Sequence, residues 1–188
     1  MSSRYSWKLA EIVTVVVLAV ALGVLWWGWT FLSALATPLH AVGLDYLFAG
    51  VWFTGGTLIP FLIRRPGAAI VGEVLAAVVE GFITQWGITA VIWGLAQGVG
   101  AELIFALTRY RRYNLPVLMT AGAVSGLFSW ILDFFYSNYL GLSPWIWAVQ
   151  VGSVLVGGVV WAGIVAWFIG RGILRTGVLQ NMLPEAEY

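Results

Sequence analysis

Six apolar runs, each about as long as a membrane-crossing helix, account for almost the whole sequence. A transmembrane helix needs about 20 predominantly apolar residues, and these runs are continuous, whereas barrel strands alternate polar and apolar residues. We therefore expect an all-α integral membrane bundle of six transmembrane helices, in a single domain over residues 1–188 with a short polar tail from about residue 176. The expected spans are Ile12–Trp29, Leu44–Ile63, Ala68–Thr84, Ile88–Leu107, Val117–Tyr136 and Trp145–Ile169.

The composition excludes several classes of function. Only 9% of the residues are charged, against about 25% in soluble domains, and so short a chain cannot enclose that much apolar surface in water. A soluble enzyme and a nucleic-acid binder are therefore excluded. There is no cysteine and a single histidine, His40, so neither a thiolate site nor a two-histidine zinc site is expected. No Gly-Lys pair exists for a phosphate-binding loop. We expect no catalytic residue, no metal and no cofactor.

The basic residues predict the orientation of the bundle. With six spans, all nine lysine and arginine residues fall on one side of the membrane. Positive residues mark the cytoplasmic side, so both termini are expected in the cytoplasm. If the number of spans were one too many or one too few, these charges would be divided between the two sides. That all nine fall on one side therefore supports six spans. The residues are Arg4, Lys8, Arg64, Arg65, Arg109, Arg111, Arg112, Arg171 and Arg175.

Carboxylates at membrane depth are costly and mark candidate sites. Glu80 and Asp133 are expected in the outer halves of the third and fifth spans, where no basic residue can pair with them. They are protonated, reached by water, or neutralised by a cation from outside. The last two options describe an anionic pocket open to the outside. Glu73 and Glu102 lie closer to the cytoplasmic arginines, where structural ion pairs are expected. Glu11 is expected to pair with the single lysine on the helix surface.

Aromatic and amide side chains surround the expected positions of the two outer carboxylates. Tryptophan is concentrated near the outer ends of the spans, partly as an interfacial belt. Aromatic rings beside carboxylates also stack on cationic rings and attract them, and the amides of Gln97 and Gln150 can fix ring nitrogens. The sequence predicts a pocket for a flat, cationic heterocycle, with Trp93 and Trp130 as its floor. The other aromatic candidates are Trp86, Tyr136, Trp145 and Trp147.

Two further patterns concern the packing of the bundle and the entrance of the pocket. The spacings Gly94-x-x-x-Gly98 and Gly122-x-x-x-Gly126 allow helices to approach closely. The connection Thr30–Gly43 is long and largely apolar, and it is expected to be either a lid over the pocket or a segment lying on the surface.

Two segments resemble a known family. Gly72-Glu73-Val74-Leu75-Ala76-Ala77-Val78-Val79-Glu80-Gly81 and Gln97-Gly98-x-Gly100-Ala101-Glu102 look like the YkoE-type S components of energy-coupling factor (ECF) vitamin transporters. The similarity extends over nearly the whole chain, from Trp7 to about Arg175. That family is associated with thiamine or its hydroxymethylpyrimidine precursor.

The resemblance implies a multi-pass protein of the bacterial plasma membrane that binds one of these compounds from outside. Delivery would require a transmembrane T component and two cytoplasmic ATPases, which hydrolyse the ATP. In such a pocket Glu80 or Asp133 would face the thiazolium ring of thiamine, while Gln97 or Gln150 would contact the pyrimidine.

The first helix departs from one pattern of that family. S components that share an energising module carry Ala-x-x-x-Ala in this helix for docking, whereas the nearest match here is Ala19-x-x-x-Gly23. That departure would suit a transporter with its own dedicated module. A competing hypothesis is a proton-coupled exporter of cationic compounds, which also needs a membrane carboxylate and aromatic side chains.

Overall fold

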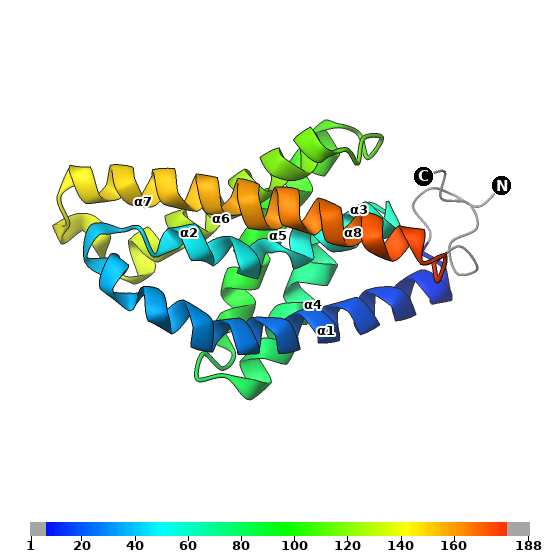
Figure 1. The fold of residues 1–188 in the computed structure, drawn as a ribbon, viewed down its shortest axis with the longest axis horizontal. Helices are drawn as coiled ribbons and strands as arrows, with labels where there is room; N and C mark the ends of the chain where they lie inside the picture. Colours follow the sequence, from blue (N-terminus) through cyan, green and yellow to red (C-terminus); the bar gives the residue numbers. More distant parts are fainter. Residues whose placement is uncertain (1–6, 180–188) are drawn as a thin grey trace.

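Six helical segments run back and forth along the molecule in the computed structural model, which describes residues 7–179 (Figure 1). Three segments are single helices, and the other three are built from consecutive helical pieces. In chain order the pieces are α1 (Leu9–Ser33), η1 (Ala34–Val42), α2 (Tyr46–Ala49), η2 (Gly50–Phe53), α3 (Gly55–Ile63), α4 (Ala68–Ile83), α5 (Thr89–Leu107), α6 (Leu115–Tyr136), η3 (Tyr139–Gly141), α7 (Pro144–Gly157), η4 (Gly158–Val165) and α8 (Ala166–Arg175).

The expected all-α membrane bundle of six helical segments is confirmed. Among the described residues, five segments are long and apolar enough to cross a membrane. The exception is α4, which has 16 residues and carries Glu73 and Glu80. At a rise of about 1.5 Å per residue it is about 24 Å long. Because α4 packs between α1 and α5, its carboxylates lie inside the bundle and not against lipid.

Three of the expected boundaries differ from the structure. The second run is not one helix, because it changes from α2 to η2 and then to α3 around Gly50, Gly55 and Gly56, where glycine weakens helical continuity. The last segment continues to Arg175 through the π-helix η4, so its two arginines lie on the helix. The segment 30–43 is largely helical: α1 continues to Ser33, and η1 follows as a 3₁₀ helix.

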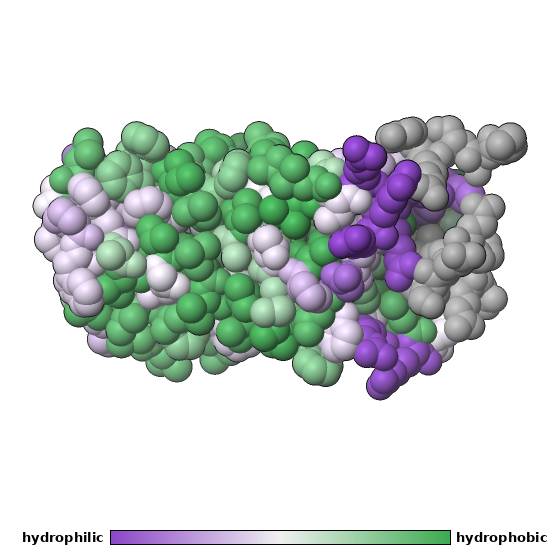
Figure 2. Space-filling view, turned by 90° about the horizontal axis from the view of Figure 1, so that it is seen from above, coloured by the Kyte–Doolittle hydropathy of each residue, from purple (hydrophilic) through white to green (hydrophobic). Residues whose placement is uncertain are grey.

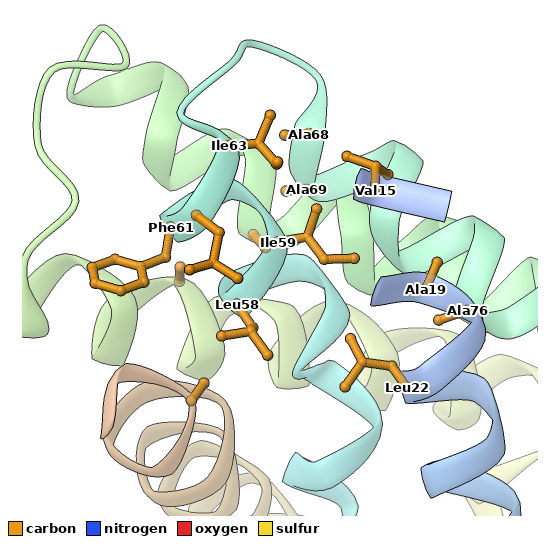
Figure 3. Close-up of a cluster of buried hydrophobic side chains, with 14 of the residues drawn as sticks. Val15, Ala19, Leu22, Leu58, Ile59, Phe61, Ile63, Ala68, Ala69 and Ala76 are labelled. Atoms are coloured by element: carbon orange, nitrogen blue, oxygen red, sulfur yellow. The ribbon is translucent and has the colours of Figure 1, made fainter. Parts of the chain in front are cut away.

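The core is centred on α3, whose nine residues are all buried. Figure 3 shows Ile59 of α3 on the side of Val15 of α1 and Ala69 of α4. Leu58 points the other way, and a Cβ on Gly170 of α8 would lie 3.2 Å from its Cδ1. On α1, Ala19 is 1% exposed, and a Cβ on Gly23 would lie 2.7 Å from the backbone oxygen of Ala76. These two residues of the Ala-x-x-x-Gly spacing therefore pack inside the bundle and are not available to a partner protein.

The glycine spacings of α5 and α6 also lie at close helix contacts. A Cβ on Gly94 would lie 2.6 Å from the Cβ of Ala77 on α4. A Cβ on Gly122 would lie 2.3 Å from the backbone oxygen of Gly158 in η4. Small residues let these backbones approach, as the spacings predict.

A buried ion pair connects α1 to the turn between α3 and α4. Nε and a terminal nitrogen of Arg65 each lie 2.8 Å from Oε1 of Glu11, and Oε2 of Glu11 accepts the backbone N–H of Lys8 at 2.8 Å. Glu11 is 4% exposed, so the expected position on the helix surface is wrong. Glu102, also expected in an ion pair, accepts the backbone N–H groups of Gly67 and Ala69 at 2.6 and 3.0 Å. It thereby caps the N-terminus of α4.

The two ends of the molecule differ in charge. The helix α1 begins and α8 ends at the same end (Figure 1). Figure 2 shows strongly hydrophilic side chains in a band toward that end, beside a largely hydrophobic body. Arg4 and residues 180–188 of the expected polar tail lie outside the described residues. The exposed arginines of this basic end are Arg109, Arg111, Arg112, Arg171 and Arg175.

Candidate functional site

A cavity of about 620 Å³ opens near the end of the bundle opposite the basic end. Small-molecule sites span about 300 to 1,000 Å³, so the cavity is large enough for an organic ligand. Its wall combines two carboxylates within the spans with aromatic rings from four helical segments. The residues that line the cavity include Trp26, Thr30, Ser33, Ala34, Thr37, His40, Asp45, Tyr46, Trp52, Phe53, Glu80, Trp86, Trp93, Gln97, Ser129, Asp133 and Tyr136.

Glu80 enters the cavity wall from the last turn of α4. It is 4% exposed, and its Oε1 accepts a hydrogen bond of 2.8 Å from the indole Nε1 of Trp52. Trp52 belongs to η2, the 3₁₀ piece of the interrupted second segment. The described residues give Oε2 no hydrogen-bond partner, so one oxygen of this carboxylate is available to a ligand.

Asp133 enters the wall from α6, and both of its oxygens are engaged. Oδ1 accepts from Nε1 of Trp93 at 2.6 Å, and Oδ2 accepts from the hydroxyl of Tyr46 at 2.9 Å. The Tyr46 hydroxyl also lies 3.1 Å from that of Tyr139. Burial raises the pKa of Tyr139 above its ordinary value, at which a phenol is already neutral at physiological pH. Asp133 therefore fixes two aromatic rings from other segments, and Tyr136 meets Trp93 edge to face at 4.7 Å between ring centroids.

Gln97 supplies an amide to the wall from the middle of α5. Its Nε2 donates to Oγ of Ser129 at 3.0 Å, and its backbone oxygen accepts from Oγ of Ser125 at 2.9 Å. Both serines lie on α6 and are buried. The bond to Ser129 holds the side-chain amide in one orientation, and a held amide can select among the donors and acceptors of a heterocycle.

The segment 30–43 forms part of the cavity wall. Thr30 and Ser33 of α1, and Ala34, Thr37 and His40 of η1, line the cavity. His40 Nδ1 lies 2.8 Å from Oδ2 of Asp45 at the start of the second segment. This contact joins the 3₁₀ helix to the start of the next helix, five residues further along the chain. The segment lines the cavity on one side, while Leu35 and Val42 are exposed on its surface, so both expectations for it remain predictions.

The structure brings six of the ten predicted binding residues to this one cavity, and four lie elsewhere. The six are Glu80, Trp86, Trp93, Gln97, Asp133 and Tyr136. The other four belong to α6 and α7 and do not line the cavity. Trp130 donates to Oε1 of Gln150 at 3.1 Å, Trp147 donates to the backbone oxygen of Tyr139 at 2.8 Å, and Trp145 is 73% exposed. Trp130 is thus a hydrogen-bond donor to Gln150 and not a residue of the cavity floor.

Several cavity residues were not singled out from the sequence. Tyr46, at the start of α2, and Trp52 of η2 both come from the second segment. Trp26, which as an outer aromatic fits an interfacial belt, is 1% exposed and donates to Oγ1 of Thr54 at 3.2 Å. The run Thr54-Gly55-Gly56 inside an apolar stretch is a signal for the interruption. Nothing in the sequence, however, indicates which ring it would bring to which carboxylate.

Comparisons with known proteins place this chain beside membrane transport subunits. A family model described as "ABC-type cobalt transport system, permease component" matches residues 10–128. A protein of Bacillus subtilis (strain 168), YkoE, whose name describes a candidate HMP/thiamine permease, is 35% identical over 184 residues, or 97% of this chain and 92% of that protein. A solved structure described as "Crystal structure of an S-component of ECF transporter" matches with a TM-score of 0.89 at 34% identity, covering 94% of this chain and 90% of that one.

Proposed function

Because this chain belongs to the S components of ECF transporters, we propose that it captures thiamine or its hydroxymethylpyrimidine precursor from outside a bacterial cell. An S component is the non-catalytic, substrate-binding subunit, and it works with a T component and ATPase subunits. The chain is therefore a multi-pass membrane protein whose contribution to transport is recognition.

The orientation follows from the charge difference between the two ends. Positive residues mark the cytoplasmic face, so the basic end and both termini face the cytoplasm. The connection between α4 and α5, which contributes Trp86 to the cavity wall, then lies at the outer face. The cavity thus opens toward the outside, where an uptake system meets its substrate.

The observation that carries the proposal is a carboxylate with one available oxygen in an aromatic cavity. Glu80 provides the negative charge and Trp52 holds its other oxygen. The thiazolium of thiamine is a permanent cation and its aminopyrimidine is a flat donor and acceptor ring, so charge and stacking both favour it. Asp133 serves to orient Trp93 and Tyr46, since both of its oxygens are already bonded. Gln97 is assigned to the pyrimidine, which thiamine and its precursor share.

Isothermal titration calorimetry on the purified chain in detergent tests this proposal. Thiamine and hydroxymethylpyrimidine are titrated separately, with riboflavin as a vitamin of different shape and no fixed positive charge. We expect thiamine to bind, the precursor to bind more weakly because it lacks the thiazolium charge, and riboflavin not to bind. Absence of binding by both thiamine and the precursor would overturn the proposal.

Transport by the chain alone provides a second test. The purified protein is reconstituted in vesicles, without a T component or ATPases, and a pH gradient is imposed. We expect no accumulation of labelled thiamine, because in an ECF system the partner subunits supply the energy. Accumulation driven by the gradient would favour a proton-coupled transporter of cationic compounds instead.

A further inference from the structure

A second carboxylate of α4 lies outside the cavity wall and has no assigned role. Glu73 is 0% exposed, and its Oε2 accepts the backbone N–H of Gly56 at the start of α3. Its other oxygen, Oε1, is buried and has no hydrogen-bond partner among the described residues. A carboxyl buried at membrane depth is costly. Its one hydrogen bond, to Gly56, is therefore the place to look for its role.

The contact lies where the second segment changes from η2 to α3. The first N–H groups of a helix have no partner within that helix, and inside a membrane no lipid can satisfy them. Glu73 supplies an acceptor for Gly56, the second residue of α3. Its carboxyl thus stabilises an interruption that would otherwise leave a buried backbone donor unpaired.

Glycines on two neighbouring helices make room for this carboxyl. A Cβ on Gly55 would lie 2.7 Å from Oε2 of Glu73, and one on Gly56 would lie 3.3 Å from the same oxygen. On the other side, a Cβ on Gly98 of α5 would lie 3.2 Å from the Cβ of Glu73. The carboxyl therefore lies against glycine backbone of α3, and the base of the side chain lies against glycine backbone of α5.

The same helix holds the other side of the interruption through Glu80. Trp52, which precedes the change, donates to Glu80, and Gly56, which follows it, donates to Glu73. The two carboxylates are seven residues apart and share one face of α4. With a rise of about 1.5 Å per residue, the two attachment points are about 10 Å apart along the helix. Trp52 and the residue after it, Phe53, both line the cavity.

We propose that Glu73 is a positioning residue for the ligand cavity: by accepting the N–H of Gly56 it holds the interrupted segment so that Trp52 is presented to Glu80 and to the ligand. The inference rests on the proposed function, because one of its two measurements is the affinity for thiamine. Only one oxygen of the side chain is engaged, so the neutral amide of glutamine provides the same acceptor. Alanine provides none, and aspartate is shorter by one methylene.

The test combines thiamine affinity with a spectroscopic probe of Trp52. The chain is labelled with 5-fluorotryptophan, and the ¹⁹F resonance of Trp52 is assigned with W52F. We expect E73A and E73D to shift this resonance and to weaken thiamine binding about tenfold, the upper end of what the loss of one hydrogen bond costs. E73Q is expected to restore both the resonance and the affinity.

E102A is the matched control, because Glu102 is also buried and also accepts backbone N–H groups, but at the basic end. It should lower thermal stability and leave the Trp52 resonance and the affinity unchanged. The proposal is overturned if E73A and E73D leave both readouts unchanged, if E73Q is as damaging as they are, or if E102A weakens binding equally. If the wild-type chain binds neither thiamine nor its precursor, the proposed function fails, while the Trp52 resonance still decides the role of Glu73.

Discussion

Trp93 on α5 donates a hydrogen bond of 2.6 Å to Oδ1 of Asp133 on α6, and this contact joins two neighbouring helices at the cavity wall. Asp133 also accepts from Tyr46 of the second segment. One carboxylate thus ties together three of the six segments. Glu80 differs, because only one of its oxygens is bonded. The two outer carboxylates should therefore respond differently to mutation.

Asp133→Asn should destabilise the protein even without ligand. An asparagine whose oxygen accepts from Trp93 turns its NH2 group toward Tyr46, so the Tyr46 hydroxyl no longer donates to this side chain and both bonds lose their charged acceptor. The cost of such a loss is about 1 to 3 kcal/mol. The measurement is thermal unfolding of the ligand-free protein in detergent. Tyr46→Phe is the matched variant, because it removes one donor and keeps the carboxylate. Unfolding of D133N at the wild-type temperature would contradict the structural role of Asp133.

Glu80→Gln should weaken thiamine binding and leave the ligand-free protein intact. The amide oxygen of glutamine still accepts from Trp52, whereas the negative charge that faces the cation is lost. Removing one member of a buried charge pair costs several kcal/mol, so the affinity should fall about 100-fold. Affinity for the uncharged hydroxymethylpyrimidine should fall much less. An equal loss for both compounds in calorimetry would show that Glu80 does not recognise the thiazolium charge.

Glu11→Ala should destabilise the bundle without affecting the cavity. It removes the carboxylate that lies 2.8 Å from the guanidinium of Arg65, in a site where the side chains of Glu11 and Arg65 are 5% and 15% exposed. Breaking a buried ion pair costs about 3 kcal/mol. The double variant E11L/R65M replaces both charges with apolar groups and should recover much of that loss. A double-mutant cycle from reversible unfolding measures the coupling, and thiamine affinity should stay constant in every variant. Additive effects in the cycle would argue against the pair.

Gly50→Ala should be strongly destabilising, whereas Gly28→Ala should not. A Cβ on Gly50 would lie 2.0 Å from the backbone oxygen of Gly157, so the interrupted segment would have to move away from α7. Overpacking of this kind costs about 1 to 3 kcal/mol. Around Gly28 on α1 nothing lies within 4 Å of the added carbon, and alanine favours the helix. Thermal unfolding of both variants provides the comparison, and equal midpoints would exclude a close helix contact at Gly50.

The sequence by itself determined the class of protein, the number of helical segments and the depth of most polar groups. Continuous apolar runs leave few alternatives to membrane helices, and the positions of the turns then fix how deep each residue lies. For that reason Glu80, Gln97 and Asp133, far apart in the chain, could be expected at one cavity, where the structure places all three.

Only the tertiary structure decided which way each side chain points and what it contacts. The helices α6 and α7 are apolar on nearly all sides, so no amphipathic stripe indicates which face is buried against neighbours. Trp130 and Gln150 thus have the right depth but bond to each other outside the cavity, while Trp52 enters it through an interrupted segment. Likewise Glu11 pairs with Arg65, 54 residues away in the chain. Depth follows from counting residues along a helix, whereas rotation about its axis follows from packing against the other helices.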